Sequence, residues 1–352
     1  SATVTDRDGL MTTVEQLLRV RDPADVNAPA VLLDAGLVGE RLAAASEITG
    51  QVVDTNLEEW RLEIARAGSE RWTLLAEGNT ATSGLLATLD PARFESGFYV
   101  LRLSARDIAG RAAEVSVSIE LAAAQKQGQY LRSEADFSFT LAGHTLEFAR
   151  RFDSLTAVER GSFGFGWSLA LRDVRLETNV PLTGSEASGV FSPLQQGSRL
   201  YLTTPTGERL AFTFAPQAGG GSGLSWWTPA WVADGDHGWQ LHSFDQRLQR
   251  GSNRFYALQS GAPYNPAALI GERAQYLLIA PDGTRYEIAA ADGITAIVFT
   301  DGGRLEVSDS GISGPGNENL RWIRGADGAL RQVITPDGRT FTGQVRDGSF
   351  VA

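Results

Sequence analysis

Residues 136–171 read DFSFTLAGHTLEFARRFDSLTAVERGSFGFGWSLAL, and their pattern is typical of a β-protein. Between residues 146 and 152, large side chains occupy every second position, which is the period of a strand with two different faces. These positions are Leu146, Phe148, Arg150 and Phe152. Glycines and rings then alternate, in the order Gly161, Phe163, Gly164, Phe165, Gly166 and Trp167. This alternation predicts a backbone that passes close to another strand while its rings fill a core.

Composition excludes several classes of protein. The chain has 352 residues, which suggests two or three domains at roughly 100–200 residues each. Its 42% hydrophobic and 21% charged content is that of a folded chain. A net charge of −11 argues against a protein that binds phosphate backbones. The chain has no cysteine, so disulfides, thiolate metal sites and cysteine nucleophiles are excluded, and no apolar run approaches the roughly 20 residues of a membrane span.

Residues 1–27 are predicted to be the terminal hairpin of a preceding sandwich domain, followed by a linker. Asp8-Gly9 is a hairpin turn pair, and alternation continues from Leu10 to Val20. A helix over Val14–Val20 is the competing interpretation. The first residues have no signal-peptide pattern, and we interpret the start as a cut made inside a longer chain.

Residues 28–122 are predicted to form one complete β-sandwich, because short strands and turn signals follow one another closely. Ile48–Asp54 is interpreted as strand, turn and strand, with the turn at Gly50. Tyr99, with Leu101 and Leu103 on the same face, is expected to return its hydroxyl to the preceding loop. Asp107–Gly110 is the next predicted turn. The segment resembles the immunoglobulin-like or fibronectin type III-like modules of bacterial surface proteins, and residues 123–135 are interpreted as a connector.

The region 136–352 has turn pairs at a nearly regular step. They are Asp282-Gly283, Asp292-Gly293, Asp301-Gly302, Ser310-Gly311, Asp327-Gly328, Asp337-Gly338 and Asp347-Gly348. An Asp-Gly pair adopts positive φ readily at both central positions, which suits two-residue hairpin turns. One strand plus one turn per step predicts a large, continuous antiparallel β-sheet over 136–352.

A family resemblance rests on the same stretch. Phe148, Arg150, Phe152-Asp153-Ser154 and then Gly161, Phe163-Gly164 and Gly166-Trp167 resemble the opening of Rhs/YD-repeat proteins. In that family a strand of the type R-x-Y-x-S is followed by G-x-F-G-x-G-W. Phe299–Leu305, FTDGGRL, is similar to the family's Y-D-x-x-G-R-L repeat, with Phe299 and Thr300 in place of Tyr and Asp.

The resemblance implies a secreted or cell-surface bacterial protein. Repeats of this family coil into a hollow β-shell that encloses a C-terminal toxin or effector, and other members act as adhesins. The sandwich would then be a stalk, and residues 136–352 the plug or first turns of the shell. The implied partners are further repeats and an effector of the parent polypeptide, or a glycan or host or neighbour cell surface. Neither nucleic acid nor a membrane span is expected.

Catalytic and metal-binding motifs are absent from the sequence. It has no Gly-x-Ser-x-Gly elbow, no phosphate loop ending in Gly-Lys and no His-Glu-x-x-His pair, and only three histidines. We therefore expect no enzyme activity, no cofactor and no metal site. The sequence leaves two alternatives open: a pair of catalytic carboxylates that the fold brings together, and a stalk that calcium stiffens.

The alternative function is that of a carbohydrate-binding module. Rings that stack on sugars and carboxylates that bind hydroxyls would come from Trp226, Trp227, Trp231, Trp239, Asp234 and Asp236. In the competing interpretation these rings fill the core of a sheet, because aromatic residues dominate β cores by buried area. His237 and His242 would join a metal site only if the loop between them folds back. The glycine-rich run 219–223 predicts a flexible loop.

Overall fold

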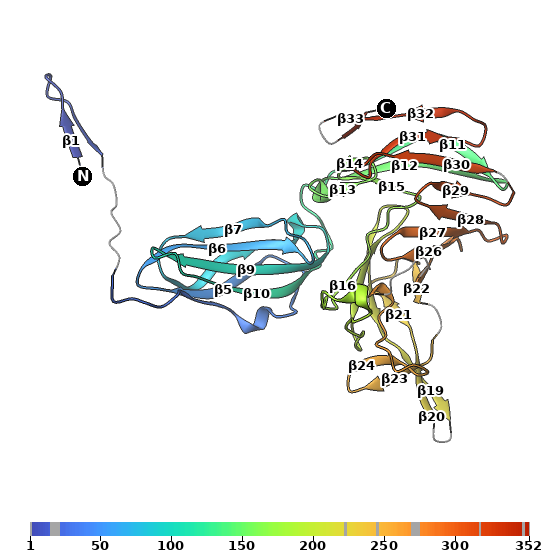
Figure 1. Ribbon diagram of the computed structural model, residues 1–352, viewed down its shortest axis with the longest axis horizontal. Coiled ribbons are helices and arrows are strands. Elements are labelled where there is room, and N and C mark those ends of the chain that lie inside the picture. The colour runs from blue at the N-terminus through green and yellow to red at the C-terminus, as the bar shows by residue number, and fades with distance from the viewer. Residues whose placement is uncertain are drawn as a thin grey trace. The chain divides into compact units, whose positions relative to one another are not determined.

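The computed structural model describes residues 2–14, 22–221, 224–243, 246–268, 275–316, 318–346 and 349–351 (Figure 1). Strands account for 53% of the chain, and the described residues contain 3-10 turns but no α-helix. The predicted all-β class is therefore confirmed. Within the described part no helix is long and apolar enough to cross a bilayer. The chain divides into two compact units, Ser1–Pro91 with Tyr99–Ala122, and Ala92–Phe98 with Ala123–Ala352.

Besides a two-stranded hairpin at its N-terminus, unit 1 contains two sheets whose strand orders are β4-β10-β9-β6-β7 and β3-β5-β8. Their strands are β3 (Ala30–Leu33), β4 (Arg41–Leu42), β5 (Ser46–Val53), β6 (Leu57–Arg66), β7 (Thr73–Gly78), β8 (Thr82–Leu89), β9 (Gly97–Asp107) and β10 (Ala112–Leu121). Alternate residues are buried along both central strands, as period-two strands require: Trp60, Leu62 and Ile64 on β6, and Tyr99, Leu101 and Leu103 on β9. The predicted alternation is confirmed for these strands.

The predicted turn at Gly50 is wrong. β5 runs through this residue, which pairs with Leu33 on one side and Gly84 on the other. A Cβ at Gly50 would lie 2.5 Å from the carbonyl oxygen of Leu32. This glycine therefore allows a close approach between strands, which is a common reason for glycine inside a strand.

The Tyr99 hydroxyl of β9 accepts a bond from the Arg66 guanidinium of β6 at 3.4 Å.

The N-terminal hairpin is confirmed. β1 (Ala2–Thr5) and β2 (Met11–Val14) pair in register from Ala2 with Val14 to Thr5 with Met11. The carboxylate of Asp6 accepts bonds from the amides of Asp8 and Leu10, which fixes the turn between them. The predicted continuation towards Val20, and the helical alternative, lie largely on residues 15–21, outside the described residues.

Unit 2 consists of several sheets, so a single sheet over 136–352 is wrong. The first is β11 (Leu131–Leu141), β12 (His144–Asp153) and β15 (Trp167–Leu169), and β11 begins inside the predicted connector. A second contains β16 (Glu177–Thr178), β17 (Arg199–Thr203), β18 (Arg209–Phe214) and β21 (Trp231–Ala233). A third contains β19 (Gln217–Gly221), β20 (Leu224–Thr228), β23 (Leu248–Gly251) and β24 (Arg254–Ala257). Short strands β13 (Arg160–Gly161) and β14 (Gly164–Phe165) join β33 (Gln344–Arg346) and β34 (Ser349–Val351).

A nine-stranded antiparallel sheet forms the rest of unit 2. Its strands are β22 (Gln240–Ser243), β25 (Tyr276–Ile279), β26 (Arg285–Ala289), β27 (Gly293–Val298), β28 (Arg304–Ser308), β29 (Gly311–Ser313), β30 (Asn319–Arg324), β31 (Leu330–Ile334) and β32 (Thr340–Thr342). From β25 to β32 each strand pairs with the next one in sequence, so the predicted meander is confirmed for this stretch. It is limited to this stretch because the regular Asp-Gly step starts only at Asp282.

Four corners of the meander, at Asp282-Gly283, Asp301-Gly302, Asp327-Gly328 and Asp337-Gly338, are three-residue turns, so the predicted two-residue type is wrong for these Asp-Gly pairs. The corner between β28 and β29 has two residues, because Ser308 pairs with Gly311. At Pro281–Gly283 the amide of Ala280 donates to the carbonyl of Thr284, and that of Gly283 donates back to Ala280. Positive φ falls on the glycine, and no aspartate of the described residues has it. The Asp282 carboxylate accepts from the Thr284 amide at 2.8 Å, and this bond satisfies an amide in the turn. A three-residue turn of this kind needs glycine at one position only.

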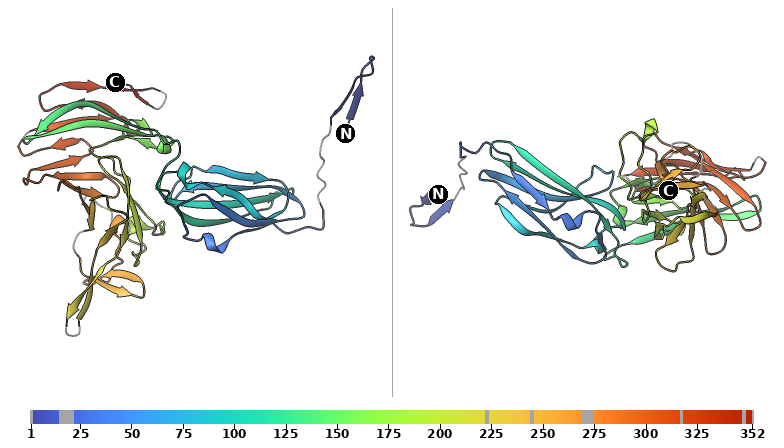
Figure 2. Two further views of the ribbon diagram at one scale, coloured as in Figure 1. Left: turned by 180° about the vertical axis from the view of Figure 1, so that it is seen from behind. Right: turned by 90° about the horizontal axis from the view of Figure 1, so that it is seen from below.

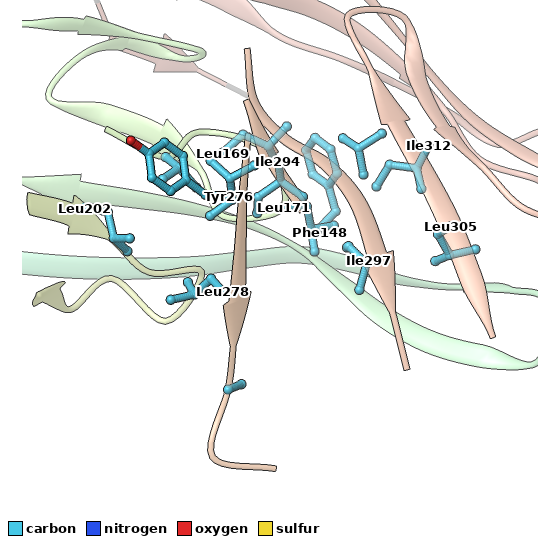
Figure 3. Close-up of a cluster of buried hydrophobic side chains, with 14 of the residues drawn as sticks. Phe148, Leu169, Leu171, Leu202, Tyr276, Leu278, Ile294, Ile297, Leu305 and Ile312 are labelled. Carbon is cyan, nitrogen blue, oxygen red and sulfur yellow. The ribbon is translucent and has the colours of Figure 1, made fainter. Parts of the chain in front are cut away.

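The core of unit 2 joins the glycine–aromatic stretch to the meander. Phe148 of β12 and Leu169 of β15 lie with Ile294 and Ile297 of β27 in one buried cluster (Figure 3). At the far end of the meander, the rings of Phe137 and Phe341 stack with centroids 4.2 Å apart. Figures 1 and 2 accordingly show β11 and β12 lying along β30 and β31.

Candidate functional site

The glycines of the opening stretch permit close packing, as predicted. A Cβ at Gly161 would lie 2.0 Å from the carbonyl oxygen of Trp167. Gly166 has φ of +74°, and its Cβ would lie 2.7 Å from the ring of Phe152. Phe163 between them is fully buried. These residues hold the loop after β12 against the strand, and that loop forms one wall of a cleft.

The cleft has a volume of about 800 Å³ and lies entirely within unit 2. We call it the Arg151 cleft. Its walls come from β11 and β12, from the loop of residues 153–175, and from the turns at residues 203–207, 291–293 and 324–328. Its volume is that of a small-molecule or peptide site. The sequence pattern predicted that this stretch builds a core, and it did not indicate a cleft beside that core.

Adjacent arginines of β12 lie on opposite faces of its sheet. Arg150 faces Asp136, and two of its guanidinium nitrogens donate to the two carboxylate oxygens, each at 2.7 Å. Its guanidinium also lies 5.3 Å from the ring centre of Trp167. Arg151 follows it and therefore projects to the other face, where it lines the cleft. The adjacent arginines were the sequence signal for Arg151 in the cleft, because two consecutive residues of a strand point to opposite faces of its sheet.

Arg151 has no ion pair among the described residues. Burial lowers the pKa of its guanidinium, since burial disfavours the charged form, and the Tyr286 hydroxyl nearby opposes this only weakly. A Cβ at Gly207, which has φ of +95°, would lie 3.2 Å from Cδ of Arg151. The arginine stem therefore rests against a turn that has no side chain at this point.

A second partly buried guanidinium lines the same cleft. Arg324 donates to the Ser162 hydroxyl at 3.1 Å and to the Gly328 carbonyl at 2.9 Å. Its Nε is buried and makes no hydrogen bond. Burial lowers the pKa of this group as well, against the weaker influence of Asp173. Both guanidiniums are thus less hydrated than surface arginines.

Most carboxylates of the cleft already have partners. Arg175 pairs with both Glu95 and Glu159. Asp173 accepts from the Ser162 hydroxyl at 2.9 Å and from the Leu169 amide at 2.7 Å. Asp153 accepts from the Leu155 amide, and burial raises the pKa of its carboxyl. These groups brace the loop after β12.

The tryptophans predicted to bind sugars differ in their surroundings, although Trp227 and Trp231 pack against the same buried cluster. Trp231 packs beside Phe214 and Tyr276, and its Nε1 donates to the Ser243 hydroxyl at 3.2 Å. Trp239 is 5% exposed and donates to Glu208. Trp239 therefore belongs to the packed interior of unit 2, and Trp231 is half-buried against it.

The remaining two tryptophans, Trp226 and Trp227, are consecutive residues of β20, and both are half-buried. Trp227 packs edge-on against Phe255, with ring centres 5.7 Å apart. Trp226 lies over Gly219 of the neighbouring strand, and the Arg247 guanidinium sits 4.5 Å from its ring centre.

The polar residues of that cluster also differ in their surroundings. Asp234 pairs with Arg199 through two bonds of 2.6 and 3.1 Å, whereas Asp236 is exposed. Nδ1 of His237 accepts from the Trp239 amide, and His242 is exposed on β22.

One group of carboxylates in unit 1 has metal-like spacing. Asp25, Asp54 and Asp107 each offer an oxygen, and the three oxygens lie within 4.8 Å of one another. Asp107 is fully buried, which alone would raise its pKa, but the Arg111 amide and guanidinium bind it and hold the pKa below its usual value. Asn56 donates to Asp25 and to Asp54 through its side-chain and backbone nitrogens. These protein groups already satisfy part of the cluster's charge and bonding capacity.

Comparisons with known proteins add no family. No protein-family model matches the chain, and no curated protein matches it significantly in sequence. The resemblance to Rhs/YD-repeat proteins therefore rests on the residues quoted for it, between Phe148 and Trp167 and in Phe299–Leu305.

Proposed function

We propose that the chain is a non-catalytic structural and interaction segment of a large secreted or surface bacterial protein of the Rhs/YD-repeat type. The sandwich would act as a stalk, and unit 2 as the plug or first turns of a β-shell around a toxin, or as part of an adhesin. The observation that carries this proposal is the meander from β25 to β32, in which the same three-residue turn recurs at four corners.

Growth by repetition supports a shell. Four steps of the meander consist of a short strand and an Xaa-Asp-Gly corner, so further repeats would add strands without a new type of connection. Among the described residues the last strand of the sheet, β32, pairs only with β31. Exposed edges template further strands, so an added repeat is the natural cover for β32.

The packing of the opening stretch supports the role of a plug. Phe148, Leu169 and Leu171 contribute to the same buried cluster as strands β25 to β29. The stretch that resembles the family's opening motif is therefore packed into the meander's core. Removing it would expose the meander's apolar face, so the two parts form one folding unit.

A test compares this chain with a longer version of its parent polypeptide by amide hydrogen exchange. Phe341 pairs with Val333, and the turn and strand bonds alternate so that the amides of Thr340 and Thr342 face away from β31. We expect exchange at Thr340 and Thr342 to be fast in the present chain and slowed at least tenfold when a further repeat pairs with β32. The Phe341 amide, already bonded, is the internal control. Equal exchange at Thr340 in both proteins would contradict the shell.

A further inference from the structure

We propose that the Arg151 cleft is a binding site for an acidic polypeptide segment, in which an aspartate or glutamate carboxylate pairs with the guanidinium of Arg151. This goes beyond a structural role, and it does not depend on the Rhs/YD resemblance, because it follows from the cleft's geometry alone.

The contrast between neighbouring arginines carries the first step. Arg150 and Arg151 have the same chemistry and the same strand, yet one has a bidentate carboxylate partner and the other has no ion pair in the described part of the chain. A desolvated cation is normally paired, because the attraction of a counter-ion offsets its lost hydration. The missing counter-ion of Arg151 is therefore expected from a ligand, and the cleft provides the space for it.

The position of Arg151 is fixed before any ligand binds. Its backbone lies in the middle strand of a three-stranded sheet, where it pairs with Ser133 on one side and Ser168 on the other. Its side-chain stem lies against Gly207. A preorganised guanidinium loses little conformational entropy on binding, and its planar fork fits a carboxylate with two bonds.

The other charges of the cleft favour an anion with a single charge. Six carboxylates of the described residues line the walls, those of Glu95, Asp153, Glu159, Asp173, Asp292 and Asp327, and they would repel a doubly charged phosphate more strongly than a carboxylate. Four described arginines line the cleft besides Arg151, and three of them, Arg132, Arg160 and Arg175, are paired with carboxylates. A carboxylate at Arg151 is the anion that this balance accommodates.

The size and lining of the cleft favour a polypeptide over a free acid. A volume of about 800 Å³ far exceeds that of acetate. Leu131 and Val174 line the cleft and give apolar flanking groups a surface. Ser133 and Ser168, which pair with Arg151 on the two sides of β12, give hydrogen-bonding groups. An extended segment that alternates apolar and acidic side chains matches this arrangement.

The test uses the whole chain and the capped peptides N-acetyl-Leu-Glu-Leu-amide and N-acetyl-Leu-Gln-Leu-amide. Binding is followed by the 15N–1H signal of the arginine Nε–H groups and by the melting temperature, which a ligand of the native state raises. We expect the glutamate peptide to bind at least about tenfold more tightly than the glutamine peptide, as loss of one charge-assisted contact implies. Arg151→Gln should remove that difference. Arg285→Gln, an exposed arginine outside the cleft, should leave it unchanged.

Other outcomes would overturn the proposal. Equal affinity for both peptides, or binding that survives Arg151→Gln, would show that Arg151 does not bind the carboxylate. Full binding of acetate or inorganic phosphate at the same concentrations would contradict a polypeptide ligand. If the Arg151→Gln chain does not fold, the comparison of the two peptides on the unchanged chain still decides.

Discussion

The adjacent arginines of β12 give the sharpest stability prediction. Arg150→Gln removes two bonds of 2.7 Å and leaves Asp136, whose side chain is 20% exposed, without its guanidinium. Loss of one partner of a buried ion pair costs about 3–5 kcal/mol, and the partial exposure reduces this to about 2–3 kcal/mol. Arg151→Gln breaks no ion pair and replaces a desolvated charge by a neutral amide, so we expect a change within about 0.5 kcal/mol of zero, or a gain.

Urea unfolding at neutral pH measures both variants. Trp60 and Trp72 lie in unit 1, and the other six of the eight tryptophans lie in unit 2, so fluorescence reports mainly on the unit that contains β12. The midpoint should fall clearly for Arg150→Gln and stay near that of the unchanged chain for Arg151→Gln, with the same slope for both. Equal losses would refute the reasoning, because they would mean that Arg151 has a stabilising partner in the native state.

Three further predictions concern turns, pH and glycans. Gly338→Ala should cost about 1–2 kcal/mol for its positive φ alone, whereas Gly293→Ala should cost more, because its Cβ would also lie 2.1 Å from the Arg172 carbonyl oxygen; urea midpoints that fall equally would contradict this. Burial raises the pKa of Asp153 above its ordinary 3.8, so the native state binds the proton more strongly and stability contributed by this group is lost as pH rises from that value. The advantage of Asp153→Asn in urea should therefore grow between roughly pH 4 and roughly pH 7, and a constant or shrinking advantage would rule out this cause. On a glycan array Trp226→Ala should abolish any binding that uses β20 while changing the free energy of unfolding by no more than about 0.5 kcal/mol. Trp231→Ala should destabilise unit 2 by about 3 kcal/mol or more, so it cannot serve as a binding control.

The strand pattern and the corners of the meander could be predicted from the sequence, because both depend on residues that are close together in the chain. Alternation along β6, β9 and β12 follows from the pleat, and Asp-Gly pairs mark corners because glycine is the residue that readily takes positive φ. The type of turn could not be predicted from the sequence, because an Asp-Gly pair fits both the two-residue and the three-residue hairpin turn. What selects the longer turn is the set of hydrogen bonds across it, such as that from Ala280 to Thr284.

The division of unit 2 into several sheets was harder to predict, because strand pairing between distant segments leaves little local trace. β12 ends at Asp153, and its second partner, β15, follows only after a loop whose glycines fit the shapes of Phe152 and Trp167. Sequence reasoning could say that this loop packs closely. It could not say which face of the sheet the loop covers, and so it could not find the cleft.

The Arg151 cleft shows which part of a site a single sequence can reveal. Adjacent arginines on a strand must lie on opposite faces, so the sequence already required that only one of them could face the Phe148 side of β12. Deciding which arginine is paired needed Asp136, which lies fourteen residues earlier in the chain and whose register is shifted by the irregularity between Ala135 and Phe137. An irregular register of this kind redirects side chains across a sheet. The unpaired charge of Arg151 thus depends on a pairing detail of β11, and for this reason a binding hypothesis had to wait for the fold.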